Sequence, residues 1–408
     1  MSEQRIFRSC RVLTPARVNA RACAFVFAVA ASLGVSPAAR GGDTLNIATW
    51  GGAYGQSQEI AFFEPYAKET GTRIATEIYD GSLAKLKDMI GGDNAAIDVA
   101  DVSAGVLNAL CKDGLLETIA TSSLGAAPSG ESAEQDFFAD SLSSCGVGSV
   151  AWAMTIAIDR QAFGKGAPSQ VANLLDTKRF AGKRALPNSA RRTLELALLA
   201  DGVEPANVYT ELATQAGADR AFKALDKIKA EVFWWDNAEE AMTWLLERKA
   251  VMAATYSGRL FRATVGTRQR YAAIWDGQIY DLDLWAIPKS AKNKDGALRF
   301  IAFATDPARL AAQAQLIAYG PVRKSALPLV GKHPVIDVAM LAYLPTAPDN
   351  FKKALKFDEG WWDANGAALE SRFEAWRGPL SAGQGKPPTA EAKPEEAEAG
   401  QETPKAAP

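Results

Sequence analysis

The chain has 408 residues, with 45 basic and 47 acidic side chains and 48% hydrophobic residues, which is enough apolar content for two globular domains. Its nearly balanced charge argues against nucleic acid and anionic membrane surfaces as partners. A single histidine, His333, excludes sites that need several histidines, such as zinc clusters, and triads centred on a catalytic histidine have little support.

The first 41 residues have the composition of a secretory signal peptide. Arginines are frequent up to Arg21, the apolar run ACAFVFAVAASLGV follows, and the small residues SPAARGG come next. This order predicts export to the periplasm with cleavage near Ala38, and the apolar run is too short to span a bilayer. The alternative is an uncleaved amphipathic anchor. Without residues 1–41 the chain keeps 39 basic and 46 acidic residues, a net charge of −7.

Strands and helices alternate through the body of the chain. The segments predicted as strands are LNIATW (45–50), TRIATEIY (72–79, with Ile74 and Ile78 inside), IDVADVS (97–103), GSVAWAMTIAID (148–159), RALP (184–187), AEVFWWD (230–236) and AVMAATYSG (250–258). Helical spacing of apolar residues is clearest over 238–246 and again over 369–376. The alternation predicts α/β layers with mostly parallel sheets, and the long apolar run 148–159 predicts a strand that links two lobes.

Two cysteines remain after removal of the signal peptide. Cys111 and Cys145 form an even count in an oxidising compartment, which predicts one disulfide; two separate buried thiols are the alternative. At the other end, residues 379–408 are rich in Pro, Glu, Lys and Ala and have almost no larger apolar residues. Such a segment cannot bury enough surface to offset its ordering entropy, so we expect a disordered tail.

Aromatic residues gather where the predicted strands end. The residues concerned are Trp50, Trp234, Trp235, Tyr256, Trp285, Trp361 and Trp362. In open α/β sheets ligands bind beyond the carboxyl ends of strands, and aromatic faces beside carboxylates suit a cationic amine. The pattern favours a binding site for a small cation over a purely structural use of these rings.

Two stretches resemble the spermidine/putrescine-binding proteins of bacterial ABC importers. They are ATWGGAYGQSQEIAFFEPYAKETG (48–71) and DLWAIPKSAKNKDGALRFIAFATDPARLAAQAQLIAYGPVRKSAL (283–327), and the similarity extends over most of residues 43–378. The resemblance implies an α/β, two-lobed periplasmic-binding-protein fold of type II, with hinge crossings and a ligand cleft between the lobes. The implied lobes are residues 42–157 plus 283–318 and residues 158–282 plus 319–378. It also implies a monomer that passes a small solute to an inner-membrane ABC permease, with no cofactor and no metal.

The resemblance also places candidate ligand-binding residues. They are Trp50, Tyr54, Ser103, Tyr256, Asp283, Tyr319 and Trp362, with Asp283 as the carboxylate that holds an amine. Asp281, which alternates with Asp283 on one strand face, is a further candidate. One departure stands out. The polyamine binders carry acids early in the helix that corresponds to NSARRTLELALLADG, where this chain has Ser189 and Arg192. A guanidinium that faces the cleft would repel an amine and suit an anion.

Three functions therefore stay open at this point. The first is import of a cationic solute such as putrescine or spermidine. The second is binding of an anionic or amino-acid-like solute through Arg192, and a ligand sensor that presents its closed form to a receptor is a variant of both. The third is a secreted enzyme that uses Asp281 and Asp283 as paired carboxylates.

Overall fold

The computed structural model describes residues 44–92, 96–267 and 270–380. The predicted signal peptide, 1–41, lies outside the described residues, as does the predicted tail, 379–408, beyond its first two positions. No helix in the described ranges is both long and apolar enough to cross a membrane.

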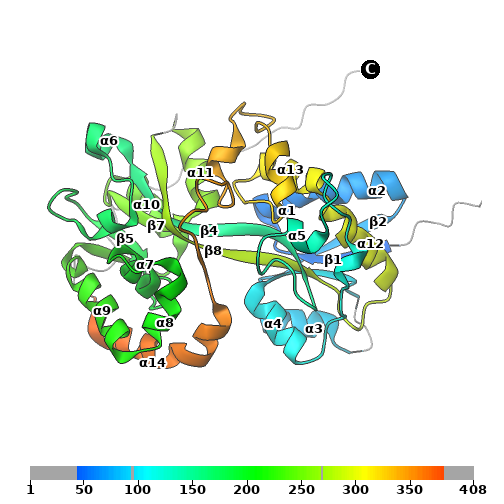
Figure 1. Cartoon of the computed structure of the whole chain (residues 1–408), viewed down its shortest axis with the longest axis horizontal. Helices are drawn as coiled ribbons and strands as arrows, with labels where there is room; N and C mark the ends of the chain where they lie inside the picture. Colours follow the sequence, from blue (N-terminus) through cyan, green and yellow to red (C-terminus); the bar gives the residue numbers. More distant parts are fainter. Residues whose placement is uncertain (1–43, 93–95, 268–269, 381–408) are drawn as a thin grey trace, which may run out of the picture. The chain divides into compact units, whose positions relative to one another are not determined.

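The described residues form one mixed sheet of nine strands with the order β2-β1-β3-β8-β4-β7-β5-β6, and β9 pairs with β8 (Figure 1). The strands are β1 (Thr44–Thr49), β2 (Arg73–Ile78), β3 (Val99–Ser103), β4 (Val147–Asp159), β5 (Arg184–Pro187), β6 (Val232–Trp235), β7 (Met252–Tyr256), β8 (Tyr271–Ala286) and β9 (Leu355–Lys356). The expected alternation of strands and helices is confirmed, and so is a mostly parallel sheet, because five of the eight strand pairings among the described residues are parallel. The three antiparallel pairings all involve the long strands: β8 runs antiparallel to both β3 and β4, and β4 runs antiparallel to β7.

Helices follow most strands. The α-helices are α1 (Gly52–Gln58), α2 (Glu64–Thr70), α3 (Leu83–Ile90), α4 (Ala104–Lys112), α5 (Ala133–Asp136), α6 (Arg160–Phe163), α7 (Thr193–Ala200), α8 (Val208–Leu212), α9 (Gln215–Asp226), α10 (Ala238–Leu246), α11 (Ser257–Gly266), α12 (Lys294–Ala304), α13 (Pro307–Leu316) and α14 (Glu359–Arg377). A π-helical turn, Glu59–Phe63, joins α1 to α2. Several helices begin where the sequence offers a capping side chain: Ser103 Oγ accepts from the amide of Val106 at the start of α4.

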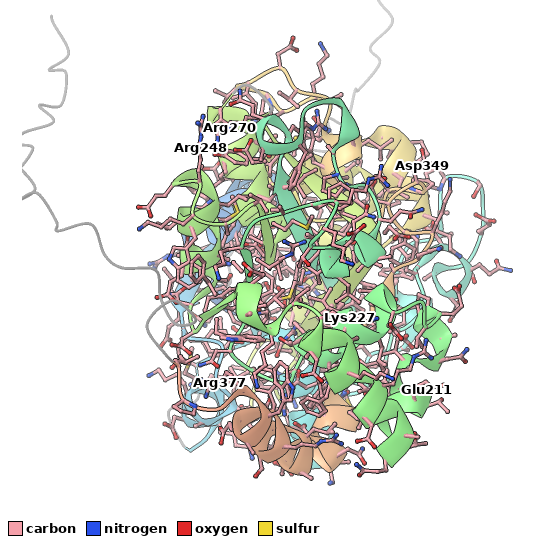
Figure 2. The ribbon with its side chains drawn as sticks, turned by 90° about the vertical axis from the view of Figure 1, so that its left-hand side faces the viewer. Glu211, Lys227, Arg248, Arg270, Asp349 and Arg377 are labelled. Carbon is pink, nitrogen blue, oxygen red and sulfur yellow. A yellow bond between two sulfur atoms is a disulfide. The ribbon has the colours of Figure 1, made fainter. Side chains whose placement is uncertain are left out.

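The two long strands β4 and β8 run side by side across the molecule in Figure 1. They pair from Val147–Trp285 at one end to Asp159–Tyr271 at the other, with two irregularities in register. At the second end Arg270, labelled in Figure 2, donates from Nε to Asp159 Oδ1 at 2.9 Å. Each strand therefore passes through both halves of the sheet, which is the geometry of a hinge crossing.

Two hydrophobic clusters lie along this sheet. One is built from residues within 45–151 and 282–326, and the other from residues within 154–279 and 355–373. The predicted lobe boundaries stay a prediction, and some core residues pack across them. Met154 and Ile156, which the prediction assigns to the first lobe, pack in the second cluster, whereas Val322 and Ala326, assigned to the second lobe, pack in the first cluster. Their neighbour Arg323 explains the second case, because it forms a fully buried ion pair with Asp136 at 2.6 Å between Nε and Oδ2.

The predicted disulfide is confirmed. Cys111, near the end of α4, is bonded to Cys145, which lies just before β4, with a Cα–Cα distance of 5.9 Å and a sequence separation of 34. A loop of this length is worth about 4 kcal/mol in the chain-entropy model. The bond fixes α4, and with it the end of β3, to the start of a hinge strand.

Some burial predictions are wrong. Ile78, expected inside, is 67% exposed because β2 is the edge strand of the sheet and its last residues have no neighbour on one side. The strand-end tryptophans Trp234, Trp235 and Trp285 are buried in the two clusters rather than facing a ligand. Trp285, for example, packs edge-on against Phe62 and Phe300.

Candidate functional site

The ends of three strands meet around a cavity of about 270 Å³. β1 ends just before Trp50, β3 ends at Ser103 and β7 ends at Tyr256. The complete lining consists of Trp50, Tyr54, Ser103, Trp152, Tyr256, Arg259, Asp283 and Tyr319. Cavities that take drug-sized molecules are commonly about 300–1,000 Å³, so this one suits a smaller solute.

Local backbone features place the aromatic walls. Gly51 has φ 72°, a left-handed conformation that allows the chain to turn sharply from β1 into α1 and brings Tyr54 over the sheet. On the other side, a Cβ added at Gly258 would lie 2.9 Å from the ring of Tyr319. A larger residue there would push Tyr319 out of its place in the wall.

Asp283 is the cavity's acidic side chain. Its residue is only 7% exposed, and Trp152 donates to its Oδ1 from Nε1 at 3.1 Å. Within the described ranges no lysine or arginine lies within ion-pair distance of it. Burial, followed by the nearby carboxylate of Asp101, raises the pKa of Asp283 well above its ordinary value. A buried carboxylate without a cation is costly, and a ligand cation would remove that cost.

Aromatic rings surround this carboxylate. The rings of Trp152 and Tyr256 meet edge to face with centroids 5.4 Å apart, and those of Tyr54 and Tyr319 lie 5.8 Å apart. Trp50 completes the wall. Each desolvated contact between a cation and such a ring is worth about 2 kcal/mol, so the wall and Asp283 favour the same kind of group.

Arg259 gives the cavity a basic side chain as well. It lies in the first turn of α11, and its guanidinium carbon is 5.4 Å from the centroid of the Tyr256 ring. Its Nε donates to Glu239 at 2.7 Å, which leaves other N–H donors of the five that a guanidinium carries. Burial, followed by Asp283, raises the pKa of Tyr319 to about 12, while Arg259 acts in the opposite direction. The pKa of Tyr319 therefore depends on both charges of the cavity.

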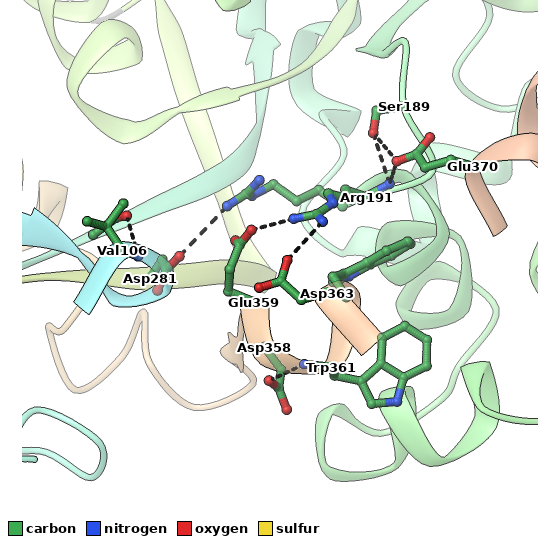
Figure 3. Close-up of polar contacts among 12 residues, drawn as sticks. Val106, Ser189, Arg191, Asp281, Asp358, Glu359, Trp361, Asp363 and Glu370 are labelled. Atoms are coloured by element: carbon green, nitrogen blue, oxygen red, sulfur yellow. Dashed lines mark hydrogen bonds and ion pairs between the residues drawn. The ribbon is translucent and has the colours of Figure 1, made fainter. Parts of the chain in front are cut away.

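The structure places Arg192 and Asp281 outside this lining, although both were predicted to bind ligand. Arg192 stacks on Phe357, with its guanidinium carbon 3.8 Å from the ring centroid. Its Nη2 lies 3.8 Å from Oδ2 of Asp281, the carboxylate labelled in Figure 3. Lys356 donates to Asp281 Oδ1 at 2.6 Å. Asp281 is therefore already paired with protein cations. Arg192 also lies 5.4 Å from the ring of Trp152, so this cluster stands behind the cavity wall.

Ser189 and Trp362 are also placed elsewhere. Ser189 donates to Glu370 Oε1 at 2.6 Å, a contact that joins the loop before α7 to α14 (Figure 3). Trp362 is 1% exposed and donates to the buried carboxylate of Glu195. The resemblance suggested a ligand contact, and the pair Trp361–Trp362 lies between a glycine and an acid, but the side chain of Trp362 points into the core beneath α14.

Sequence reasoning missed two lining residues. Trp152 is an aromatic within the long apolar run of β4, and nothing in its neighbourhood distinguishes it from a core residue. Arg259 had a usable signal, because it follows Tyr256-Ser257-Gly258 at the end of β7 and so falls in the first turn of the next helix.

Other hollows are larger but chemically plainer. Two of them have volumes of about 680 and 830 Å³. Their carboxylates are exposed to solvent, apart from that of Glu359, which pairs with Arg191. Across the described ranges no group of three or more histidine, cysteine or carboxylate side chains could hold a metal ion.

Comparison with known proteins identifies relatives over most of the chain. The family described as bacterial extracellular solute-binding protein matches residues 61–340. The gamma-aminobutyric acid-binding protein of Pseudomonas aeruginosa is 36% identical over 333 residues, which cover 82% of this chain and 90% of that protein. The spermidine/putrescine-binding periplasmic protein of Escherichia coli is 24% identical over 79% of this chain and 88% of its own length. The solved structure of the Atu4243 GABA receptor is similar with a TM-score of 0.66 and 26% identity, over 83% of this chain and 99% of that one.

Proposed function

Because this chain belongs to the bacterial extracellular solute-binding protein family, we propose that it binds a small amino-acid-like zwitterion and delivers it to an inner-membrane ABC permease. The ligand has an ammonium at one end and a carboxylate at the other, as in γ-aminobutyrate. The binding event takes place in the periplasm and involves no reaction. The two hydrophobic clusters act as lobes that close on the ligand by bending of β4 and β8.

The observation that carries this proposal is the isolation of Asp283. Its carboxylate lines the cavity and is nearly buried, and among the described residues its one hydrogen-bond partner is the indole N–H of Trp152. The ammonium of the ligand would become its counter-ion. The surrounding aromatic faces exclude water and add cation–π attraction.

Arg259 supports a carboxylate at the other end of the ligand. It supplies the cavity's guanidinium, which matches the planar geometry of a carboxylate. One acid and one base within a cavity of about 270 Å³ suit a short zwitterion better than either a simple amine or a simple acid.

The same features disfavour polyamines, which were the first expectation. A second ammonium would face Arg259 instead of a carboxylate. Nor does the cluster of Arg192, Asp281 and Lys356 provide a second anionic site, because its two cations outnumber its acid. The relative that shares the highest identity among those compared above, at 36%, carries the name of a γ-aminobutyrate binder, whereas the polyamine binder stands at 24%.

A thermal-shift panel tests the proposal directly. The compounds are γ-aminobutyrate, putrescine, n-butylamine and butyrate, which differ mainly in the charges at their two ends. A ligand present at 100 times its Kd stabilises the folded state by about 2.7 kcal/mol. We expect γ-aminobutyrate to raise Tm most and putrescine to raise it little. A larger shift with putrescine would restore the polyamine function, and turnover of any compound would point to an enzyme.

Removal of the guanidinium should act on the carboxylate end alone. We expect Arg259→Gln to weaken γ-aminobutyrate binding by about 10- to 100-fold, the range for one hydrogen bond between charged groups, and to leave n-butylamine unaffected. Arg262→Gln is a matched control, because Arg262 lies on the same helix and also approaches Glu239, at 3.5 Å, but does not line the cavity. Calorimetric titration of both variants measures the effect. Equal losses for the two ligands would rule out Arg259 as the carboxylate partner.

A further inference from the structure

Asp101 is a second buried carboxylate, one residue removed from the cavity behind Tyr54. It is 0% exposed, and in the described part of the chain no lysine or arginine approaches it within ion-pair distance. Its oxygens accept from three neutral donors: Tyr54 Oη at 2.6 Å, Gln58 Nε2 at 2.6 Å and Ser149 Oγ at 3.1 Å. Burial raises its pKa to about 7. An isolated buried acid costs stability, so its presence calls for a reason.

The strand register brings Asp101 close to Asp283, the carboxylate that lines the cavity. Ser103 is paired with Asp283 across β3 and β8, and Asp101 lies two residues before Ser103 on the same face of the strand. Asp101 faces Trp285 across the strands and has Asp283 as its diagonal neighbour. It therefore lies beside the ammonium subsite of the proposed function without lining the cavity.

Tyr54 connects Asp101 with the cavity. A phenol has one O–H donor, and the short contact to Asp101 uses it. Burial, followed by the carboxylates of Asp101 and Asp283, holds the pKa of Tyr54 well above its ordinary value, so the proton stays on the phenol. Ser149 Oγ also lies 3.4 Å from Oη, but its own hydrogen is donated to Asp101 Oδ1 at 3.1 Å. A lone pair of Oη is then left for a donor that enters the cavity, which the side chain of Tyr54 lines.

We propose that Asp101 is a positioning residue: it fixes the Tyr54 hydroxyl as a second hydrogen-bond acceptor, beside Asp283, for the N–H groups of the ligand ammonium. This inference rests on the proposed function and adds a selectivity to it. A primary ammonium can donate to both Asp283 and Tyr54, whereas a quaternary ammonium of the same charge has no N–H to donate. The site should therefore prefer primary amines over their N-methylated forms.

A purely structural role makes a different prediction. Gln58 accepts from Thr49 Oγ1 at 2.5 Å while it donates to Asp101, so the network also ties α1 to the sheet. If that were the whole role of Asp101, its loss would weaken all ligands of the cavity by similar factors. The ratio of the affinities for two ligands of equal charge separates the positioning role from the structural role. A change in Coulomb attraction or in the rigidity of the cavity affects both ligands similarly and largely cancels in this ratio.

The experiment measures Kd by calorimetry for γ-aminobutyrate and for its N-trimethylated analogue. For Tyr54→Phe we expect the preference for the primary amine to fall by about 10- to 100-fold. Asp101→Leu should lower the same ratio by at least threefold, and the double variant should fall no further than Tyr54→Phe. Asp101→Asn should keep most of the preference, because an amide oxygen can accept from Tyr54 and Gln58 while its nitrogen donates to Ser149. This variant also tests the proposal if Asp101→Leu does not fold.

Tyr79→Phe is the matched control. The Tyr79 hydroxyl donates to the backbone oxygen of Asp101 at 2.8 Å, so its removal disturbs the same buried region without changing the acceptor at Tyr54. The ratio of the two affinities in Tyr79→Phe should equal that of the unaltered protein. A ratio that survives Asp101→Leu and Tyr54→Phe, or that falls equally in Tyr79→Phe, overturns the inference while γ-aminobutyrate binding still upholds the proposed function. If the unaltered protein binds neither compound, the proposed function fails and this inference falls with it.

Discussion

Asp283→Asn should abolish or nearly abolish binding of γ-aminobutyrate. Loss of one partner of a buried charge pair costs roughly 2–5 kcal/mol, which is about 30-fold to several-thousand-fold in affinity. The amide can still accept the 3.1 Å hydrogen bond from Trp152, so the cavity wall should keep its shape. What is lost is the counter-ion of a desolvated ammonium. Titration calorimetry on the unaltered and altered proteins measures this directly.

Asp276→Asn provides the control on the same strand. Asp276 belongs to β8 but does not line the cavity, and its Oδ2 accepts from the amide of Val171 at 2.9 Å, a bond that an asparagine can replace. We expect its affinity for γ-aminobutyrate to match that of the unaltered protein. Tight binding that survives Asp283→Asn would refute Asp283 as the ammonium partner and would favour an anionic ligand held by Arg259.

The ligand-free protein should lose stability as pH rises from about 4 to beyond 7, and Asp101→Asn should remove a large part of that loss. The pKa of Asp101 is about 7 in the folded state, against an ordinary value of about 4. Between these values the folded state holds a proton that the unfolded state has released. Its stabilising contribution is therefore complete below the unfolded pKa and disappears as pH rises through the folded pKa. Each unit of difference corresponds to about 1.4 kcal/mol.

Urea unfolding at a series of pH values measures this effect. The comparison is between the unaltered protein and Asp101→Asn, so that groups remote from Asp101, including the buried Glu195, contribute equally to both. Asp283 is the exception: Asp101 raises its pKa, so the substitution lowers that pKa and changes stability in the same direction as the loss of Asp101 itself. The variant should be the more stable protein near pH 7, and the two should converge near pH 4. Parallel curves would mean that Asp101 is ionised in the folded state at all these values, and that an unrecognised partner compensates its burial.

Much of the fold and part of the site could be predicted from the sequence alone. The alternation of strands and helices, the long strand at 148–159 and the disulfide between Cys111 and Cys145 depend on patterns along the chain or on simple counting. The places of Trp50 and Tyr256 in the cavity follow from strand ends, because the ends of neighbouring strands meet at one edge of a sheet, whereas Ser103 and Asp283 were placed by the resemblance to polyamine-binding proteins. Strand ends depend on residues that are close together in the sequence, so sequence patterns can predict them.

The choice between similar side chains was decided by the tertiary structure. Asp281 and Asp283 alternate on one face of β8 and look equivalent in the sequence. Only Asp281 is neutralised, by Lys356, which lies 75 residues further along the chain and reaches it through β9. Arg192 and Arg259 are a second example of two similar side chains with different surroundings. The first stacks on Phe357 and lies behind the wall, whereas the second faces the cavity.

The same holds for the aromatic residues. Trp50 precedes a glycine and Trp362 comes two residues after one, yet Trp50 lines the cavity and Trp362 is held in the core by Glu195. The sequence by itself determined where strands end and hence where a ligand can bind. The charge that the cavity offers depends on which acids and bases meet a partner from a distant segment. Those pairings arise only when β8, β9 and α7 pack together, because the free energy of a buried charge is set by neighbours in space rather than in sequence.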